Sequence, residues 1–310
     1  MKFDTFPLPP LNKVGWPWTI ESFPLPHLMQ NGNPWPKISI VTPSFNQGQF
    51  LEESIRSVLL QNYPNLEYII MDGGSTDNSV EIIKKYEQYL TYWTSGQDKG
   101  QADAIYKGFE LATGQIIAYI NSDDYYLPRA FEMVARKFVK KNAEFLIGSC
   151  YHIDNMSNIV RKYYGFSQNT KSLLINGMYF CQQSCFWSRE AFFSVGGFDR
   201  KLHYCFDYDL FLRLTEKYSP ITVLKTLAVY RRHPNTKSMK IKDIANYESK
   251  QLLTKYNNIL KIDNTLIKNY SNFMINKRLF GILSDIIFDP RWFIVFFRYH
   301  IKMLTNKLAK

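Results

Sequence analysis

Two adjacent carboxylates, Asp123 and Asp124, follow the apolar run Ile116–Ile120 in the segment Asn121-Ser122-Asp123-Asp124. Adjacent carboxylates repel each other, so placing both at a strand end is costly unless a cation or solvent relieves the repulsion. Mg²⁺ and Mn²⁺ prefer oxygen ligands and often retain waters and substrate phosphates. The segment therefore predicts a divalent-metal site, with a solvated turn that caps the next helix as the alternative.

Two further polar segments could serve the same chemistry. Asp72-Gly73-Gly74-Ser75-Thr76-Asp77 follows another apolar run; its glycines permit close backbone approach to a ligand, and Asp72 can accept hydrogen bonds from a base or sugar. Asp207-Tyr208-Asp209 opens a segment with helical spacing, and an aspartate at a rigid helix start can act as a general base. The plain structural alternatives are a glycine-rich turn before a helix cap, and acidic residues that offset a helix dipole.

The elements that must position these residues alternate between strand and helix patterns. Apolar runs predict strands at 38–42, 67–71, 92–94 and 116–120. Helical spacing predicts helices at 51–59, 78–89 and 102–112, the second opened by an Asn78-x-x-Glu81 capping box. This alternation indicates βαβ units, hence an α/β fold with a mostly parallel sheet, and ligands of such sheets bind beyond the carboxyl ends of the strands. The polar segments 42–46, 72–77 and 121–124 all follow predicted strands.

In type and order these motifs resemble the family 2 glycosyltransferases, inverting enzymes with a GT-A fold. The resemblance covers about residues 37–235, beginning with the family's first strand and loop at Ile38–Asn46. Asp72–Asp77 is similar to its DDGSTD-type nucleotide loop with Gly73 in place of the second Asp, and Asn121-Ser122-Asp123 occupies the DxD position with Asn in place of the first Asp. Gly196-Gly197-Phe198-Asp199, followed by Asp207–Leu210, resembles its acceptor-side segment and base. The implied fold is a Rossmann-like GT-A sheet flanked by helices.

The resemblance also implies a role for each matching residue. Asp207 would be the catalytic base, and Asp123 would be the main protein ligand of Mn²⁺ or Mg²⁺. Thr42 and Asp72 would hold the uracil of a UDP-sugar, or another base if the donor differs, while Asn121 would contact the ribose or a metal-bound water. The full set of expected donor-binding residues is Thr42, Asn46, Asp72, Asp98, Lys99, Asn121 and Asp124.

Three regions complete the predicted site. The family's Arg near the third helix is absent, so Lys99 is the candidate contact for the diphosphate, with a solvated loop lysine as the alternative. His233, after the apolar run 221–229, is a candidate metal ligand or phosphate contact, since neutral imidazole ligates Mn²⁺ and imidazolium pairs with phosphate; the alternative is a surface histidine. The residues expected to face the acceptor are Gln182, Gln183 and Trp187.

Composition limits the other functions. The chain has 310 residues and 45% hydrophobic residues, enough for a sizeable core. Its four cysteines lack a CxxC pair, which favours reduced thiols over a zinc site. The net charge of 38 − 27 = +11 is concentrated in residues 240–310, with 13 basic and 5 acidic side chains, whereas a nucleic-acid binder would spread it over a reading surface. We therefore expect no nucleic-acid partner, and no apolar run approaches the ~20 residues of a membrane span.

Composition also divides the chain into three predicted parts. Residues 1–36 hold eight of the 14 prolines and form an extended arm, pinned to the globule by Trp16, Trp18 and Trp35. Residues 37–238 would be the GT-A catalytic domain that the resemblance implies, and residues 239–310 are predicted to form a basic, amphipathic helical extension. Within the extension, 276–310 sets aromatic residues beside cations, which favours contact with an anionic membrane surface over a cap packed on the catalytic domain. The expected location is cytoplasmic, peripheral on the inner face of the cell membrane.

The sequence thus predicts an inverting, metal-assisted transfer of a sugar from a nucleotide-diphosphate sugar, with UDP favoured, to a hydroxyl of a glycan or lipid-linked acceptor. Because Asn121 and Gly73 depart from the family pattern, a catalytically inactive glycan- or nucleotide-sugar-binding protein of the same fold remains the alternative. A nicotinamide-dependent oxidoreductase is disfavoured because Thr-Pro-Ser-Phe-Asn, and not a glycine-rich turn, follows the first strand. A nucleotidyltransferase is disfavoured because no Gly- and basic-rich phosphate loop lies there.

Overall fold

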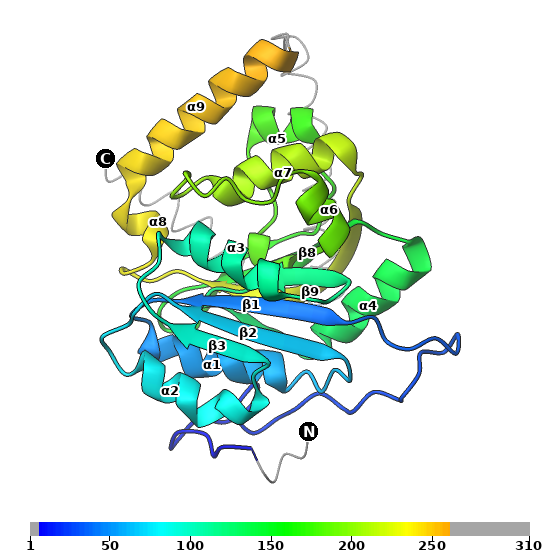
Figure 1. Ribbon diagram of the computed structural model, residues 1–310, viewed down its shortest axis with the longest axis vertical. Helices are drawn as coiled ribbons and strands as arrows, with labels where there is room; N and C mark the ends of the chain where they lie inside the picture. The colour runs from blue at the N-terminus through cyan, green and yellow to red at the C-terminus, as the bar shows by residue number, and fades with distance from the viewer. Residues whose placement is uncertain (1–5, 261–310) are drawn as a thin grey trace.

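A computed structural model describes residues 6–260 and contains one twisted, mostly parallel sheet between two helical layers (Figure 1). The strands lie in the order β3-β2-β1-β4-β8-β6-β9-β5, and β7 pairs with β6. Their bounds are β1 Ile38–Ser44, β2 Leu66–Asp72, β3 Tyr92–Ser95, β4 Ile116–Tyr119, β5 Tyr125–Tyr126, β6 Phe145–Ile153, β7 Ile159–Tyr163, β8 Cys185–Ser188 and β9 Ile221–Arg231.

The register of the parallel strands brings the predicted polar segments to one edge of the sheet. β1 pairs with β2 so that Ser44 lies opposite Asp72, and Asp72 in turn lies opposite Ser95 of β3. β4 pairs with β1 on its other side, also in parallel. All residues of β1 and β4 are buried, as expected for strands covered on both faces.

Two apolar clusters hold the helices to the sheet. On one face, buried side chains of α1, α2 and α4 pack against the strands, and on the other, those of α3, α5, α6, α7 and α9 do so. The helix bounds are α1 Gly48–Leu59, α2 Ser79–Tyr86, α3 Gln101–Leu111, α4 Ala130–Lys141, α5 Thr170–Asn176, α6 Arg189–Ser194, α7 Phe206–Lys217, α8 Lys237–Lys240 and α9 Lys242–Leu260. Two short 3₁₀ turns lie at Glu87–Tyr89 and Gln182–Ser184.

The predicted strands and helices of residues 38–120 are confirmed, with one local error. The capping box is wrong, because the Asn78 side chain makes no cap hydrogen bond. Asp77 serves instead: its Oδ1 accepts from the backbone N of Ser79 at 3.0 Å and its Oδ2 from that of Gly48 at 2.9 Å. This carboxylate therefore joins the starts of α1 and α2.

The proline-rich arm runs along α1 and α2 (dark blue in Figure 1), and its only regular pairing within residues 6–36 is an isolated bridge between Leu28 and Pro34. Trp18 and Trp35 are buried, and the Trp16 indole donates to the Tyr126 carbonyl at 2.7 Å, so the three tryptophans pin the arm as expected.

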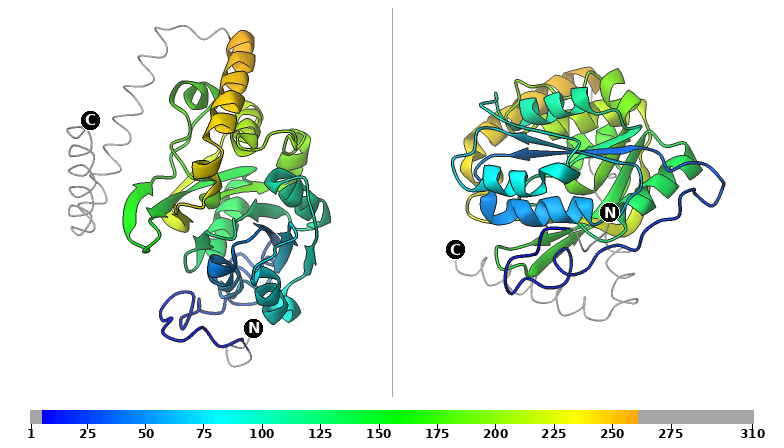
Figure 2. Two further views of the ribbon diagram at one scale, coloured as in Figure 1. Left: turned by 90° about the vertical axis from the view of Figure 1, so that its left-hand side faces the viewer. Right: turned by 60° about the horizontal axis from the view of Figure 1, so that its bottom comes forward.

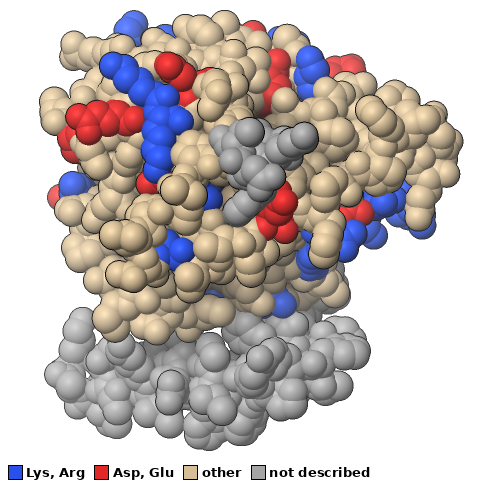
Figure 3. All heavy atoms as spheres, turned by 90° about the horizontal axis from the view of Figure 1, so that it is seen from below, with Lys and Arg blue, Asp and Glu red and all other residues tan. Residues whose placement is uncertain are grey.

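Seen from below, acidic and basic side chains are interspersed among uncharged residues (Figure 3).

Helix α9 lies on the α5 and α7 side of the molecule in both orientations of the ribbon (Figures 1 and 2). Its Leu252 and Tyr256 are buried, and Tyr256 belongs to the same apolar cluster as α3 and α7, so α9 packs on that face of the fold. The segment 276–310, for which we expect membrane contact, lies outside the described residues. Among helices within residues 6–260, none has the length and apolar character needed to cross a bilayer.

Candidate active site

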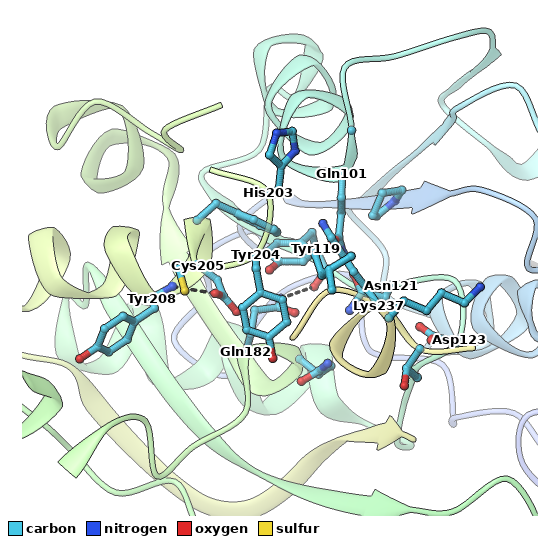
Figure 4. Close-up of a pocket in the computed structure, with 18 of the residues that line it drawn as sticks. Gln101, Tyr119, Asn121, Asp123, Gln182, His203, Tyr204, Cys205, Tyr208 and Lys237 are labelled. Carbon is cyan, nitrogen blue, oxygen red and sulfur yellow. Dashed lines mark hydrogen bonds between the residues drawn. The ribbon is translucent and has the colours of Figure 1, made fainter. Parts of the chain in front are cut away.

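A large cleft of about 1630 Å³ opens at the carboxyl ends of β1, β2 and β4 (Figure 4). Loops after these strands form one wall, and α7, α8 and the 3₁₀ turn at 182–184 contribute to the other. Seven of the predicted site residues line it: Asn46, Asp98, Asn121, Asp123, Gln182, Gln183 and Asp207. The sheet therefore gathers residues that are more than 150 positions apart in the sequence.

The nucleotide-type loop is organised by Asp72, which is buried and does not itself line the cleft. Its carboxylate accepts hydrogen bonds from the backbone N of Gly74 at 3.1 Å and of Ser75 at 2.9 Å, and from the Ser95 hydroxyl at 2.6 Å. These contacts hold Gly73 and Gly74 at the cleft wall. Asp72 thus shapes the loop that a nucleotide would meet.

Asp98 occupies the space beside Gly73. A Cβ added at Gly73 would come within 2.8 Å of Asp98 Oδ2, and the other carboxylate oxygen accepts from the Gly100 backbone N at 2.7 Å. Position 73 has no carboxylate, but the Asp98 carboxylate, from the loop before α3, lies where a side chain at that position would project. Asp98 lines the cleft, as predicted for a donor-binding residue.

Asn46 joins the first loop to the nucleotide-type loop. It adopts a left-handed backbone conformation with φ of 52°, and its side-chain oxygen accepts from the Thr76 backbone N at 2.8 Å. Thr42 lies deeper: it is fully buried, its hydroxyl bonds to that of Tyr68 at 3.0 Å, and it does not line the cleft. A direct contact of Thr42 with a base has no support in this placement.

Asn121, at the DxD position, belongs to a network of side-chain amides. Its oxygen accepts from Gln101 Nε2 at 2.6 Å, and its amide nitrogen donates to Asp124 Oδ2 at 3.0 Å. Asp124 is buried behind it and also accepts from the Arg231 backbone N at 2.8 Å and from Gln183 Nε2 at 2.7 Å. Burial raises the pKa of Asp124 well above its usual range. Asp124 therefore supports the loop and does not reach the cleft wall.

Asp123 and His233 form the candidate metal pair. Asp123 lines the cleft, and its Oδ2 lies 3.1 Å from His233 Nε2, which is held by a ring contact with Phe50 at 4.7 Å between centroids. A carboxylate oxygen and an imidazole nitrogen suit Mn²⁺, and hard cations at substrate phosphates are often held by few protein ligands. Within residues 6–260 no third His, Cys, Asp or Glu completes the pair, so the donor set fits a cation only when phosphates and waters supply the other ligands.

Asp207 lies in the first turn of α7 and lines the opposite side of the cleft. Burial raises the pKa of its carboxyl to about 6, although the Tyr208 backbone N, which donates to Oδ1 at 2.7 Å, opposes the shift. A carboxylate with a raised pKa that faces a cleft is suited to accept a proton near neutral pH.

The three expected acceptor-side residues are not placed together. Gln182 and Gln183 line the cleft, but their amides are engaged, Gln182 with the Tyr119 carbonyl at 2.9 Å and Gln183 with Asp124. Trp187 is fully buried in the core, where it stacks on Phe192 at 6.2 Å, because the strand β8 that carries it is covered by helices α3, α6 and α7. Its predicted contact with the acceptor is therefore not supported by its position.

Lys99 is exposed and does not line the cleft, so its ammonium is not positioned for the expected diphosphate contact.

Sequence reasoning missed four polar residues that the fold brings to the site: Gln101, Arg231, Lys237 and Glu248. Arg231 is buried, pairs with Glu53 at 2.6 Å and donates to the Asp123 carbonyl at 3.2 Å. The two arginines directly before His233 were an available signal in the sequence, whereas Lys237 and Glu248 had none.

The fold and motifs agree with known glycosyltransferases. TarS of S. aureus, residues 1–349 in complex with UDP-GlcNAc, is similar over 84% of this chain and 79% of its own, with a TM-score of 0.60 and 14% identity. At that identity the likeness concerns the fold alone, and it confirms the predicted GT-A architecture.

Two curated relatives are similar over parts of the chain. The Escherichia coli protein named UDP-Glc:alpha-D-GlcNAc-diphosphoundecaprenol beta-1,3-glucosyltransferase WfgD is 33% identical over 41% of this chain and 50% of its own length. Chondroitin synthase of Pasteurella multocida is 28% identical over 58% of this chain and 19% of its own length. The chain thus spans half or less of the length of these relatives.

The sequence model of the family described as Glycosyl transferase family 2 matches residues 39–196, half of the chain. The fold is of the GT-A type, and this match assigns the family. The chain belongs to glycosyl transferase family 2. An inactive binding protein of the same fold, the alternative raised by Asn121 and Gly73, is a hypothesis that a turnover assay with nucleotide sugars tests.

Proposed function

We propose that this protein transfers a sugar with inversion from a nucleotide-diphosphate sugar, a UDP-sugar by preference, to a hydroxyl of a glycan or lipid-linked acceptor. The observation that carries the proposal is the shared cleft: Asp207, with its raised pKa, and Asp123, beside His233, line the same cavity from different elements. WfgD, whose printed name specifies UDP-Glc and a diphosphoundecaprenol-linked acceptor, supports this donor and acceptor class.

In the proposed reaction, the Asp207 carboxylate accepts the proton of the acceptor hydroxyl. The acceptor oxygen forms a bond to the anomeric carbon as the bond from that carbon to the diphosphate oxygen breaks, and the released electron pair stays on the diphosphate. One displacement inverts the anomeric configuration. Gly73, Gly74 and Asp98 would bound the nucleotide, and the Asn121 amide network would hold the Asp123 loop in place.

Asp123 and His233 would hold a divalent cation together with the donor diphosphate. When bound, Mn²⁺ or Mg²⁺ supplies Lewis-acid stabilisation of the charge that develops on the leaving group. The pair of ligands is positioned by Phe50 at the His233 ring and by Arg231 at the Asp123 carbonyl.

The proposal is tested with the purified protein, a panel of UDP-, GDP- and dTDP-sugars, and the variant Asp207→Asn. The wild type is expected to turn over a donor in Mn²⁺ or Mg²⁺ and to stop in excess EDTA. Asp207→Asn should bind the same donor but lose about 10²–10⁴-fold in kcat, the usual contribution of a general base. The exposed Asp243→Asn is the matched control and should retain activity.

Full kcat in Asp207→Asn would remove this residue from the mechanism, and undiminished transfer in EDTA would exclude the cation. Failure of the wild type to bind any nucleotide of the panel would overturn the proposed donor class.

A further inference from the structure

Lys237 brings a cation into the cleft from the segment that follows β9. It lies in α8, is half-buried and lines the cleft beside Asn121 and Asp123 (Figure 4). Its ammonium donates a hydrogen bond to Gln101 Oε1 at 2.8 Å and lies 5.4 Å from the centre of the Phe206 ring. Both contacts are with neutral groups.

The contact with Gln101 ties Lys237 to the DxD position. Gln101 Nε2 donates to Asn121 Oδ1 at 2.6 Å, and Asn121 in turn donates to Asp124. The amide of Gln101 is thereby fixed at both ends, with its oxygen toward the ammonium. The Lys237 ammonium is consequently held on the side of the cleft where Asn121 and Asp123 lie, next to the candidate metal pair.

This ammonium lacks a counter-ion in the part of the chain that the structure describes. The carboxylates that face it are Asp207 on α7, Glu248 on α9 and Asp98 before α3, and none lies within ion-pairing distance. Glu248 and Asp98 are already bonded to backbone N–H groups. Burial lowers the pKa of Lys237 to about 8, which measures the cost of keeping the charge there. Burying a charge is costly unless it is paired, so an anion that entered the cleft beside this ammonium would reduce that cost.

We propose that Lys237 binds the diphosphate of the nucleotide-sugar donor and neutralises part of the charge of the departing nucleoside diphosphate. The inference rests on the proposed function, because it takes a nucleotide-diphosphate sugar as the ligand. It assigns to Lys237 the contact expected of Lys99, whose side chain is exposed outside the cleft. The ammonium is a point charge on a flexible stem, a group well suited to phosphate.

The experiment is calorimetric titration of the full chain with UDP and with uridine, in Mg²⁺, for wild type, Lys237→Met, Lys237→Arg and Lys242→Met. Lys237→Met should weaken UDP binding by about 10- to 100-fold, the usual range for losing one charge-assisted hydrogen bond, and leave uridine affinity unchanged. Lys237→Arg should recover part of the UDP affinity. Lys242 is exposed, lies close in sequence and does not line the cleft, so Lys242→Met should match the wild type.

Equal UDP affinities in wild type and Lys237→Met would overturn this inference while leaving the proposed function intact. The same would follow from a parallel loss of UDP and uridine binding, because that pattern marks a general disturbance of the cleft. If Lys99→Met weakens UDP binding and Lys237→Met does not, the exposed lysine is the diphosphate ligand and the inference is wrong. Failure of wild type to bind UDP, GDP and dTDP alike would overturn both proposals.

Discussion

Residues of the same type have different roles in this cleft because their surroundings differ. Asp72 and Asp124 are buried and saturated with hydrogen bonds from neighbouring loops, so they shape the site from behind. Asp98, Asp123 and Asp207 line the cavity and are therefore carboxylates available to ligands. Burial raises the pKa of Asp207 to about 6, which suits this group to take up a proton near neutrality.

The raised pKa of Asp207 predicts a pH dependence. The base must be deprotonated to accept a proton, and its pKa in the folded protein is about 6, so kcat/KM should level off above pH 7 and fall as the pH drops through 6. Below that pKa each pH unit should cost about tenfold, since the deprotonated fraction falls by that factor. Initial rates between pH 5 and 8, at saturating donor and at acceptor concentrations well below KM, measure this kcat/KM profile.

The residual activity of Asp207→Asn serves as the control, because it should lack this acid limb. A wild-type profile that stays level down to pH 5 would contradict the assignment.

At the scale of elements, the position of the start of α7, which carries Asp207, depends on α9. Glu248 of α9 is buried, and its carboxylate accepts from the backbone N atoms of His203, Tyr204 and Cys205 at 2.7–2.8 Å. These three residues directly precede α7, which begins at Phe206 and carries Asp207 in its first turn. Helix α9 thus fixes the segment that leads to Asp207, the proposed catalytic base.

Glu248→Gln should therefore damage both stability and turnover. The amide keeps the shape of the side chain but presents N–H groups to backbone donors, so the free energy of unfolding should fall by about 1–3 kcal/mol. Displacement of the start of α7 should lower kcat by roughly tenfold or more. Urea unfolding followed by fluorescence and initial rates at saturating donor would measure the two effects.

Glu216→Gln, on an exposed position of α7, is the matched control and should change neither quantity appreciably. Wild-type stability and kcat in Glu248→Gln would show that α9 is not needed to hold the base.

At the scale of the whole molecule, the N-terminal arm is held by one buried cation. Arg56 of α1 is 1% exposed and donates to the carbonyls of Pro7, Pro17 and Trp18 and to the Tyr86 hydroxyl. Its guanidinium also lies against the Phe6 and Trp18 rings, 4.8 and 5.6 Å from their centres. A segment without helix or strand ladders is thereby fixed on the helical layer opposite α7.

Arg56→Met should release this arm. The substitution leaves several buried carbonyl groups without a donor, so unfolding stability should decrease by about 1–3 kcal/mol, and trypsin should cleave faster after Lys13. Limited proteolysis with mass spectrometry and urea unfolding measure both changes. Lys84→Met, on the exposed face of α2, provides the control. An unchanged cleavage rate in Arg56→Met would mean that the tryptophan contacts suffice to hold the arm.

The sequence alone determined the order of strands and helices up to residue 120 and the loops that carry Asp72, Asn121 and Asp123. It could do so because apolar periodicity is a local property and because the carboxyl ends of parallel strands meet at one edge of the sheet. The prediction of the GT-A type of sheet rested instead on the resemblance of these motifs, in their order, to the family 2 glycosyltransferases.

Only the tertiary structure decided which side chains of those motifs reach the cleft. Thr42 and Trp187 carry no local mark that sets them back from the cleft, yet the helices packed over their strands enclose both. Lys237 is held at the site by its contact with Gln101, and Glu248 by its contacts with residues 203–205, all of them distant in the sequence. Contacts of this range depend on how the chain packs as a whole and leave no periodic pattern near the residues that make them.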